Sequence, residues 1–352
     1  MSNFLNQIPD NAKLLLALSG GPDSIYLLHQ LLSLRAKKNI VLNLAHFNHN
    51  TRGQASDNDA SFVKKISDQY NLPITIKKRR NRSNFSPDKT HFSEEKLRQL
   101  RYAFLEKTRL KTKSDFIITA HTLDDQIETI IFNFIRGTGP QGLTGMTFQK
   151  NNILRPLLDT PKSTILKYLY DQKIPFCCDE SNQNTEYTRN YIRQIIIPQI
   201  SKINPNYHQS ITQLSQTVTN QQNFINQETI ETLKKISLHS ITPIKNWKLK
   251  IGNLMSTAVR SREGKTGNWK LKIPEAIIQI DLKKFNRLHP ALKSQIIHYL
   301  ISPLVPTNKQ ISFKQISEIN HILKNSRGGS QKILFNTLSI AKKNDKITLY
   351  KL

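Results

Sequence analysis

Apolar and polar residues alternate in two different rhythms along the first part of the chain. Four short apolar runs have the length of buried strands: residues 12–18, 40–47, 72–76 and 116–120. Between and after them, apolar residues recur at helical spacing over residues 25–32, 60–70, 94–110 and 124–135. Strands separated by helices are typical of a parallel sheet covered on both faces. We therefore predict an α/β fold built on a parallel sheet of the five-stranded type.

The polar residues of this part gather where the predicted strands end. Ser19–Ser24 follows the first strand, His46–Arg52 the second, and His121–Glu128 the strand at 116–120. Ligands of parallel sheets bind beyond the carboxyl ends of the strands, so we expect these three segments to face one crevice. The run KKRRNR at residues 77–82 follows the third strand. It is either a solvated basic loop or, beside that crevice, a contact to a phosphate backbone.

The pattern changes after Pro198, where we expect a break. Residues 203–223 are rich in Gln and Asn, with apolar residues at helical spacing, which predicts a connecting helix. Beyond it, the sequence predicts strands at 248–251, 270–273, 276–280, 332–335 and 347–350, and helices at 291–300 and 313–322. We therefore expect an N-terminal domain (1–200), a helical linker (201–240) and a smaller mixed α+β C-terminal domain (241–352).

The amino-acid composition indicates a negatively charged binding partner. The 352 residues include 52 Lys and Arg against 25 Asp and Glu, which gives a net charge of +27. Such an excess favours a polyanion such as nucleic acid, although a generally basic proteome with a solvated surface also produces it. The only cysteines, Cys177 and Cys178, are adjacent, which disfavours a disulfide scaffold and a thiolate zinc site. No apolar run has the length of a membrane span.

The segment SGGPDS at Ser19–Ser24 is the first candidate for chemistry. Glycines between a strand and a helix leave backbone N–H groups pointing at one spot, and the helix N-terminus favours an anion there. Asp23 fits an anion site only if it holds a metal or a cationic substrate, or caps the helix. No Lys follows the glycines, so this is not the common nucleotide-binding loop. A tight, well-capped turn explains the same residues equally well.

Two further clusters carry charged side chains at informative spacings. Asp124, Asp125 and Glu128 lie at the start of a predicted helix, and the last two share a face. They suit Mg²⁺ or an ammonium group, or only the helix N-terminus. Arg189 and Arg193 are four apart on another predicted helix. They suit phosphate or base contacts, or only a helix face exposed to water.

These segments, in this order, resemble the tRNA(Ile)-lysidine synthetases. That family belongs to the N-type ATP pyrophosphatases, which have the signature SGGxDS and an adenine nucleotide alpha-hydrolase-like fold. SGGPDS matches the signature in full. The other matching motifs lie within the first 200 residues: His46-Phe-Asn48-His49-x-x-Arg52, Arg98-x-x-Arg101-Tyr102, AHTLDDQIETIIFNFIRGTGPQGLTGM at 120–146, Arg155-Pro156-Leu157-Leu158, and Ser181-Asn182 with Arg189-Asn190-x-x-Arg193. Two departures are Thr122, where the family usually has a second His, and Thr51, where it usually has Leu.

The resemblance implies a ligase that forms a carbon–nitrogen bond. ATP would adenylate the 2-carbonyl oxygen of the wobble cytidine in a CAU-anticodon isoleucine tRNA, with release of pyrophosphate. The ε-amine of free L-lysine would then displace AMP and leave lysidine, so that the tRNA reads AUA instead of AUG. ATP, Mg²⁺, L-lysine and tRNA(Ile) are the implied substrates and cofactors. The implied location is the cytoplasm, or a plastid stroma for an organelle-encoded chain, without a membrane partner; a homodimer stays open.

The resemblance also implies roles for individual residues. The residues implied to bind ATP are Ser19, Gly20, Gly21, Pro22, Asp23, Ser24, Ala45, His46 and Asn48. Those implied to bind the metal are Asp23 and Asp124. Catalysis falls to Asp23, Asp125, Glu128 and Arg189, with Asp125 and Glu128 also binding lysine. Contacts to tRNA fall to Arg52, Arg98, Arg101, Arg189 and Arg193, and the C-terminal domain would hold the acceptor side.

Two other functions compete with this one. A tRNA thiolation enzyme of the same fold would need separated catalytic cysteines or a C-x-x-C cluster motif, and the adjacent Cys177 and Cys178 supply neither. A non-catalytic tRNA-binding homologue would have no need of an intact SGGPDS together with Asp124, Asp125 and Glu128. Both features therefore favour the ligase.

Overall fold

The computed structural model divides the chain into two compact units, Met1–Val218 and Thr219–Leu352. It describes residues 4–50, 53–79, 94–177, 188–238, 276–302, 311–325, 331–334, 338–343 and 345–351. Several predictions fall outside these residues: Arg52, residues 80–82 of the KKRRNR run, the Ser181-Asn182 motif, and the strands at 248–251 and 270–273. The unit boundary lies within a helix that the sequence assigned to the linker, so the three-domain division by function stays a prediction.

A six-stranded sheet forms the centre of the first unit, in the order β3-β2-β1-β4-β6-β5. Its strands are β1 (Lys13–Ala17), β2 (Val41–Asn48), β3 (Ile74–Lys78), β4 (Phe116–Ile118), β5 (Gln149–Lys150) and β6 (Ile153–Leu154). The first four and β6 are mutually parallel, and only β5 pairs antiparallel. The predicted parallel sheet is thus confirmed. β5 and β6 escaped prediction because two residues each are too short for a periodic signal.

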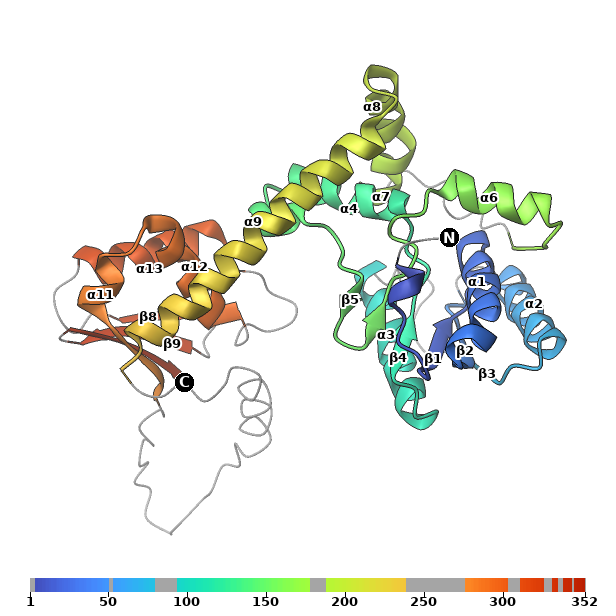
Figure 1. Cartoon of the computed structure of the whole chain (residues 1–352), viewed down its shortest axis with the longest axis horizontal. Helices are drawn as coiled ribbons and strands as arrows, with labels where there is room; N and C mark the ends of the chain where they lie inside the picture. Colours follow the sequence, from blue (N-terminus) through green and yellow to red (C-terminus); the bar gives the residue numbers. More distant parts are fainter. Residues whose placement is uncertain are drawn as a thin grey trace, which may run out of the picture. The chain divides into compact units, whose positions relative to one another are not determined.

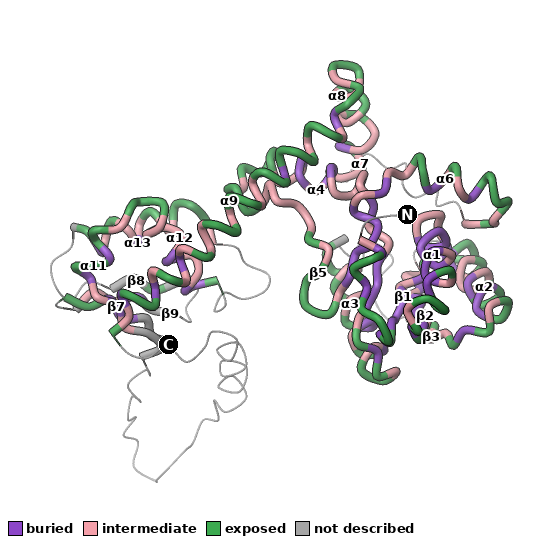
Figure 2. Tube along the Cα trace, viewed as in Figure 1, coloured by how far each residue is buried: buried purple, intermediate pink, exposed green. Residues whose placement is uncertain are grey.

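Helices cover both faces of this sheet (Figure 1). Leu14 and Leu16 of β1 belong to one buried cluster, which takes in α1 (Pro22–Lys38), α2 (Gln54–Gln69) and α6 (Lys162–Asp171). Leu15 points the other way, into a second cluster with Phe104 and Leu105 of α3 (Glu94–Lys111). Successive side chains of a strand face opposite sides, so one apolar run supplies both layers. Figure 2 shows this burial along β1 and α1.

A separate apolar cluster joins α4 (Leu123–Ile135) to the segment that follows residue 187. Ile127 and Ile131 of α4 pack with Ile192 and Tyr207. The later segment contains α7 (Thr188–Tyr191), a π-helical stretch (Ile192–Ile196), α8 (Ile197–Ile203) and the start of α9 (Tyr207–Ile236). Pro198 lies in the first turn of α8, where no backbone N–H is needed, so the helix continues past it. The domain break expected near this residue stays a prediction. α5 (Pro140–Leu143) and the single turn Leu5–Gln7 complete the unit.

The second unit contains a four-stranded antiparallel sheet in the order β7-β10-β9-β8. Its elements after α9 are β7 (Ala276–Asp281), α11 (Leu282–Asn286), α12 (Pro290–Ile301), α13 (Phe313–Asn325), β8 (Gln331–Leu334), β9 (Leu338–Lys343) and β10 (Lys346–Lys351). Its core includes Phe285, Ile296, Ile319 and Ile347. A smaller mixed α+β unit was expected here and is observed. Within the described ranges, no helix is long and apolar enough to cross a membrane.

Candidate functional site

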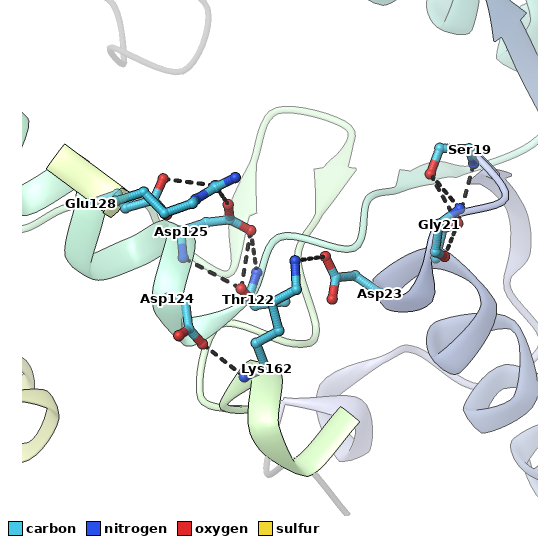
Figure 3. Close-up of polar contacts among 10 residues, drawn as sticks. Ser19, Gly21, Asp23, Thr122, Asp124, Asp125, Glu128 and Lys162 are labelled. Atoms are coloured by element: carbon cyan, nitrogen blue, oxygen red, sulfur yellow. Dashed lines mark hydrogen bonds and ion pairs between the residues drawn. The ribbon is translucent and has the colours of Figure 1, made fainter. Parts of the chain in front are cut away.

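Three helix N-termini meet beyond the carboxyl ends of the central strands. α1 begins after β1 and α4 after β4, and these strands are parallel neighbours. α6 joins them because the backbone N–H of Lys162 donates to Asp124 Oδ2 at 2.7 Å, while its Nζ lies 3.7 Å from Asp23 Oδ2 (Figure 3). Asp23 and Asp124 thus lie in the first turns of two different helices and are linked by one lysine. These two predicted segments therefore lie close together.

The phosphate-loop candidate is held by hydrogen bonds within SGGPDS. The Ser24 hydroxyl accepts from the backbone N–H groups of Ser19 and Gly20, both at 3.2 Å, and donates to the Gly21 carbonyl at 2.9 Å. Gly20 has a φ of +93°, which side chains rarely adopt. The carbonyl of Gly20 accepts from the backbone N–H of Cys177 at 2.9 Å. The turn is therefore fixed both from within and by the segment that follows α6.

Asp23 is the electrostatically unusual residue of this loop. Burial raises its pKa from 3.8 to about 6, and the nearby Asp125 and Asp124 add to that effect, whereas Lys162 opposes it. Its Oδ1 atom is buried and has no hydrogen-bond partner among the residues that the structure describes. An ionised, partly unsatisfied carboxylate at this position is suited to a cation.

Asp124 and Asp125 have different surroundings although they are adjacent. Asp124 Oδ2 accepts from the α6 backbone, and its Oδ1 lies 3.7 Å from Nε2 of His208, on α9. Asp125 Oδ2 accepts from the backbone N–H of Thr122 at 2.9 Å and from its hydroxyl at 3.1 Å. Thr122 in turn caps α4 by accepting from the Asp125 N–H at 3.4 Å, which completes a capping box. Thr122, one of the two departures from the family pattern, therefore positions Asp125.

Arg193 joins the predicted lysine-binding carboxylates instead of lying on a free surface. Its guanidinium contacts Glu128 through two hydrogen bonds, Nε to Oε1 and Nη2 to Oε2, the latter at 2.9 Å. Nη2 also lies 3.3 Å from Asp125 Oδ1. Burial raises the pKa of Glu128, and the Arg193 hydrogen bond opposes that rise. Sequence reasoning gave Arg193 to tRNA; its contacts connect it to the acidic cluster.

The acidic cluster has more carboxylates than cations that contact them. Asp23, Asp124, Asp125 and Glu128 contact two permanent cations, Lys162 and Arg193. An additional ammonium group or divalent cation would therefore balance it. Among the described residues, no group of three or more His, Cys, Asp and Glu could hold a metal ion by itself. Mg²⁺ usually takes one or two carboxylates and completes its shell with phosphates and water; of the two predicted ligands, Asp23, whose Oδ1 is unpartnered among the described residues, fits better than Asp124.

The predicted nucleoside-binding residues lie on β2, next to β1. His46 is buried, and its Nδ1 lies 2.9 Å from the Leu18 carbonyl oxygen, so Nδ1 donates. Burial lowers its pKa, which keeps the imidazole neutral at pH 7. The Asn48 amide donates to the Ser56 carbonyl and to Asp57, and thereby ties the end of β2 to the first turn of α2. The roles of Asn48 and His46 in nucleoside binding stay predictions.

A group of arginines surrounds the phenol of Tyr102, on α3. The guanidinium carbons of Arg98 and Arg101 lie 5.1 and 5.4 Å from its ring centroid. Arg155, which is buried, donates to the Thr147 carbonyl, and its pKa is lowered by burial, with Tyr102 opposing the shift. Arg189 instead lies over the ring of Phe132 on α4, at 5.7 Å. Arg98, Arg101 and Arg189 thus approach aromatic rings, an arrangement also suited to nucleic-acid contacts.

Three residues of the site were not singled out from the sequence. Lys162 and His208 contact Asp124 from distant parts of the chain, and Arg155 joins Tyr102. Arg155 had a signal in the RPLL motif. Lys162 and His208 had none, because nothing in the local pattern shows which side of α6 or α9 approaches α4.

Comparison with known proteins gives a consistent result. A family model described as the PP-loop domain matches residues 1–200. A tRNA(Ile)-lysidine synthase of Clostridium acetobutylicum is 37% identical over 216 residues, which are 61% of this chain and 47% of that protein. Another, from Clostridioides difficile, is 28% identical over 349 residues, 99% of this chain and 68% of that protein. A third, from Thermosipho africanus, is 34% identical over 230 residues, 64% of this chain and 53% of that protein.

The matches cover different shares of this chain and of its relatives. The chain spans about half the length of the Clostridium acetobutylicum and Thermosipho africanus proteins. The U34-tRNA thiolase NcsA from Methanococcus maripaludis superimposes with a TM-score of 0.49 and 20% identity, covering 60% of this chain and 73% of that one. That likeness does not discriminate between functions.

Proposed function

This chain belongs to the PP-loop family, and from that premise we propose that it is a tRNA(Ile)-lysidine synthetase. It would use ATP to adenylate the wobble cytidine of a CAU-anticodon tRNA(Ile), and the amine of free L-lysine would then displace AMP. The relatives of that name support the proposal over 216 residues of this chain and, at lower identity, over 349 residues. Action in the cytoplasm belongs to the same proposal.

One observation carries this function: Lys162 bridges the SGGPDS loop and the acidic residues of α4. Lys162 connects Asp23 of SGGPDS to Asp124 of α4, and the acidic cluster continues through Asp125 to Glu128. The reaction needs a triphosphate and an amine close to the same base. Binding both reactants at one site supplies much of the rate enhancement through proximity, so no covalent nucleophile is required.

The loop supplies the ATP-binding part of the proposed site. The amides of Ser19 and Gly20 donate to the Ser24 hydroxyl, and that of Gly21 to the Ser19 hydroxyl. On binding ATP, these amides would exchange those hydrogen bonds for the phosphates, which the N-terminus of α1 would also hold. Mg²⁺, held by Asp23 and the phosphates, would neutralise charge on the leaving pyrophosphate. Ala45 and His46 on β2 would border the nucleoside.

The acidic cluster supplies the proposed lysine-binding part. The ε-ammonium of lysine would pair with Glu128 and with Asp125 Oδ1, because Asp125 Oδ2 already accepts two hydrogen bonds from Thr122. Arg193 would hold these two carboxylates in place. Attack requires the amine in its neutral form, and adjacent carboxylates would accept the proton that the ammonium loses. Arg189, Arg98 and Arg101 would contact the tRNA.

The decisive test is ATP-dependent transfer of labelled lysine to a CAU-anticodon tRNA(Ile). We expect lysine in the tRNA, with one AMP and one pyrophosphate formed for each, and none without ATP. Elongator methionine tRNA, which has the same anticodon, is the control for specificity. Retained tRNA binding without any transfer of lysine would favour a non-catalytic binding protein, and transfer of sulfur would favour a thiolation enzyme.

A further inference from the structure

Lys162 lies at the first position of α6 and extends toward the phosphate loop. Its backbone N–H is fixed by Asp124 Oδ2 at 2.7 Å, so the start of its side chain is held in place. The ammonium nitrogen then lies 3.7 Å from Asp23 Oδ2, and Figure 3 shows the Lys162 side chain pointing toward that carboxylate. The side chain retains 41% of its exposure and that of Asp23 retains 25%. The ammonium is therefore next to the loop and still accessible.

Helix stability does not explain a lysine at this position. The N-terminus of a helix carries partial positive charge, so a cation in the first turn is unfavourable. The partly exposed pair with Asp23 is also too long for a strong hydrogen bond. Lys167, on the same helix, is exposed and shows what a solvated lysine of α6 looks like. The location of Lys162 is thus better explained by a ligand than by the fold.

The phosphate loop has anion-binding amides but no lysine of its own. In the common nucleotide-binding loop a lysine follows the glycines and reaches the β- and γ-phosphates. In SGGPDS the corresponding charged residue is Asp23, which has the opposite sign. An ATP-binding site built on this loop needs a cation from another element. Lys162 is the lysine that contacts Asp23 in the described structure.

We propose that Lys162 is the phosphate-binding lysine of this loop, supplied by α6, and that its ammonium holds the β- and γ-phosphates of ATP. This inference rests on the use of ATP in the proposed function. When the cytidine 2-carbonyl oxygen bonds to the α-phosphorus, the bond from that phosphorus to the α–β bridging oxygen breaks. Its electron pair leaves with pyrophosphate, and Lys162 donates hydrogen bonds to that group without transferring a proton.

Binding of ATP, pyrophosphate and AMP to the full chain, measured by calorimetry with Mg²⁺ and without tRNA or lysine, tests the proposal. Loss of one charge-assisted phosphate contact should weaken ATP and pyrophosphate binding by about tenfold or more in Lys162→Met. AMP lacks the β- and γ-phosphates, so its affinity should change less than about twofold. Lys162→Arg should recover part of the loss, and Lys167→Met should behave as wild type.

Several outcomes would overturn the assignment. Wild-type affinity of Lys162→Met for ATP and pyrophosphate would remove Lys162 from the phosphate site. If Lys162→Met lost as much affinity for AMP as for ATP, or had a lower melting temperature than wild type, Lys162 would have a structural role. Failure of the proposed function is recognised separately, because wild-type protein would then bind ATP in a Lys162-dependent way and still transfer no lysine to tRNA.

Discussion

Gly20 and Gly21 have different structural reasons to be glycine. Gly20 has a φ of +93°, and a Cβ built there would lie 3.3 Å from Val63 Cγ1 and 3.4 Å from atoms of Phe62 and Cys177. Gly21 has an ordinary φ of −72°, and a Cβ there would lie 3.5 Å from Ser19 Oγ, a normal contact. Only Gly20 therefore combines an unfavourable backbone conformation with a crowded position.

This contrast predicts the effect of alanine at each position. Gly20→Ala should lower the free energy of unfolding by about 1–3 kcal/mol and weaken ATP binding, because the loop must change shape. Gly21→Ala should change the free energy of unfolding by less than about 1 kcal/mol, since its backbone N–H and φ are kept. Urea denaturation of both variants measures the difference. Equal stabilities for the two variants would contradict this account of the loop.

Asp23 links stability to function through its ionisation. The folded-state pKa of about 6 exceeds the ordinary value of 3.8, so the folded chain binds the proton more tightly than the unfolded chain. The ionised carboxylate therefore costs stability above pH 6, and this cost disappears as the pH falls toward 4. Asp23→Asn should raise the free energy of unfolding at pH 7.5 by about 1–2 kcal/mol, with a smaller gain at pH 5.

The same substitution should remove the activity. Asparagine is close to aspartate in shape but cannot balance a metal ion or Lys162, so lysine transfer should fall below detection while the protein becomes more stable. Thermal unfolding at the two pH values, together with the transfer assay, measures both effects. A variant that is active, or that is less stable at pH 7.5 than wild type, would refute the role given to this carboxylate.

At the scale of elements, local periodicity was sufficient for the long helices and strands. The helix expected at 94–110 is observed as Glu94–Lys111, and the strand expected at 116–120 as Phe116–Ile118. β5 and β6 have two residues each; β6 pairs with β4, and β5 pairs with β6, so tertiary pairing and not a local pattern specifies them. The connecting helix was expected to end at residue 223 but continues to Ile236, where Leu233 and Ile236 enter the core of the second unit.

The residues of the site also differ in whether the local sequence or the tertiary packing determines where they lie. SGGPDS and the acidic residues of α4 were predictable because strand ends and helix starts specify where such segments meet. Arg193 was not, since its contact with Glu128 depends on the packing of Ile192 against Ile127 of α4. The π-helical stretch at Ile192–Ile196 also begins between the two arginines, and Arg189 and Arg193 reach different partners on α4. The four-residue spacing suggested tRNA contacts for both arginines; their partners within the chain differ, and the tRNA roles stay predictions.

At the scale of the whole molecule, the dominant feature is the net charge of +27, which the acidic site opposes locally. Binding of tRNA through Lys and Arg releases counterions, so its affinity should fall steeply with salt. Six or more phosphate contacts would lower the affinity for tRNA(Ile) by about 10³-fold or more between 50 and 200 mM salt. Filter binding over this range measures the slope.

The charge should contribute affinity without specificity, and a second tRNA separates the two. Elongator methionine tRNA has a similar phosphate backbone and the same CAU anticodon, so it should bind with a similar salt slope and still receive no lysine. If log affinity fell by less than one unit for each unit of log salt concentration, fewer than about two phosphates would be neutralised. The positive surface would then serve general solubility, and recognition would have to come from a few contacts around Arg98, Arg101 and Arg189.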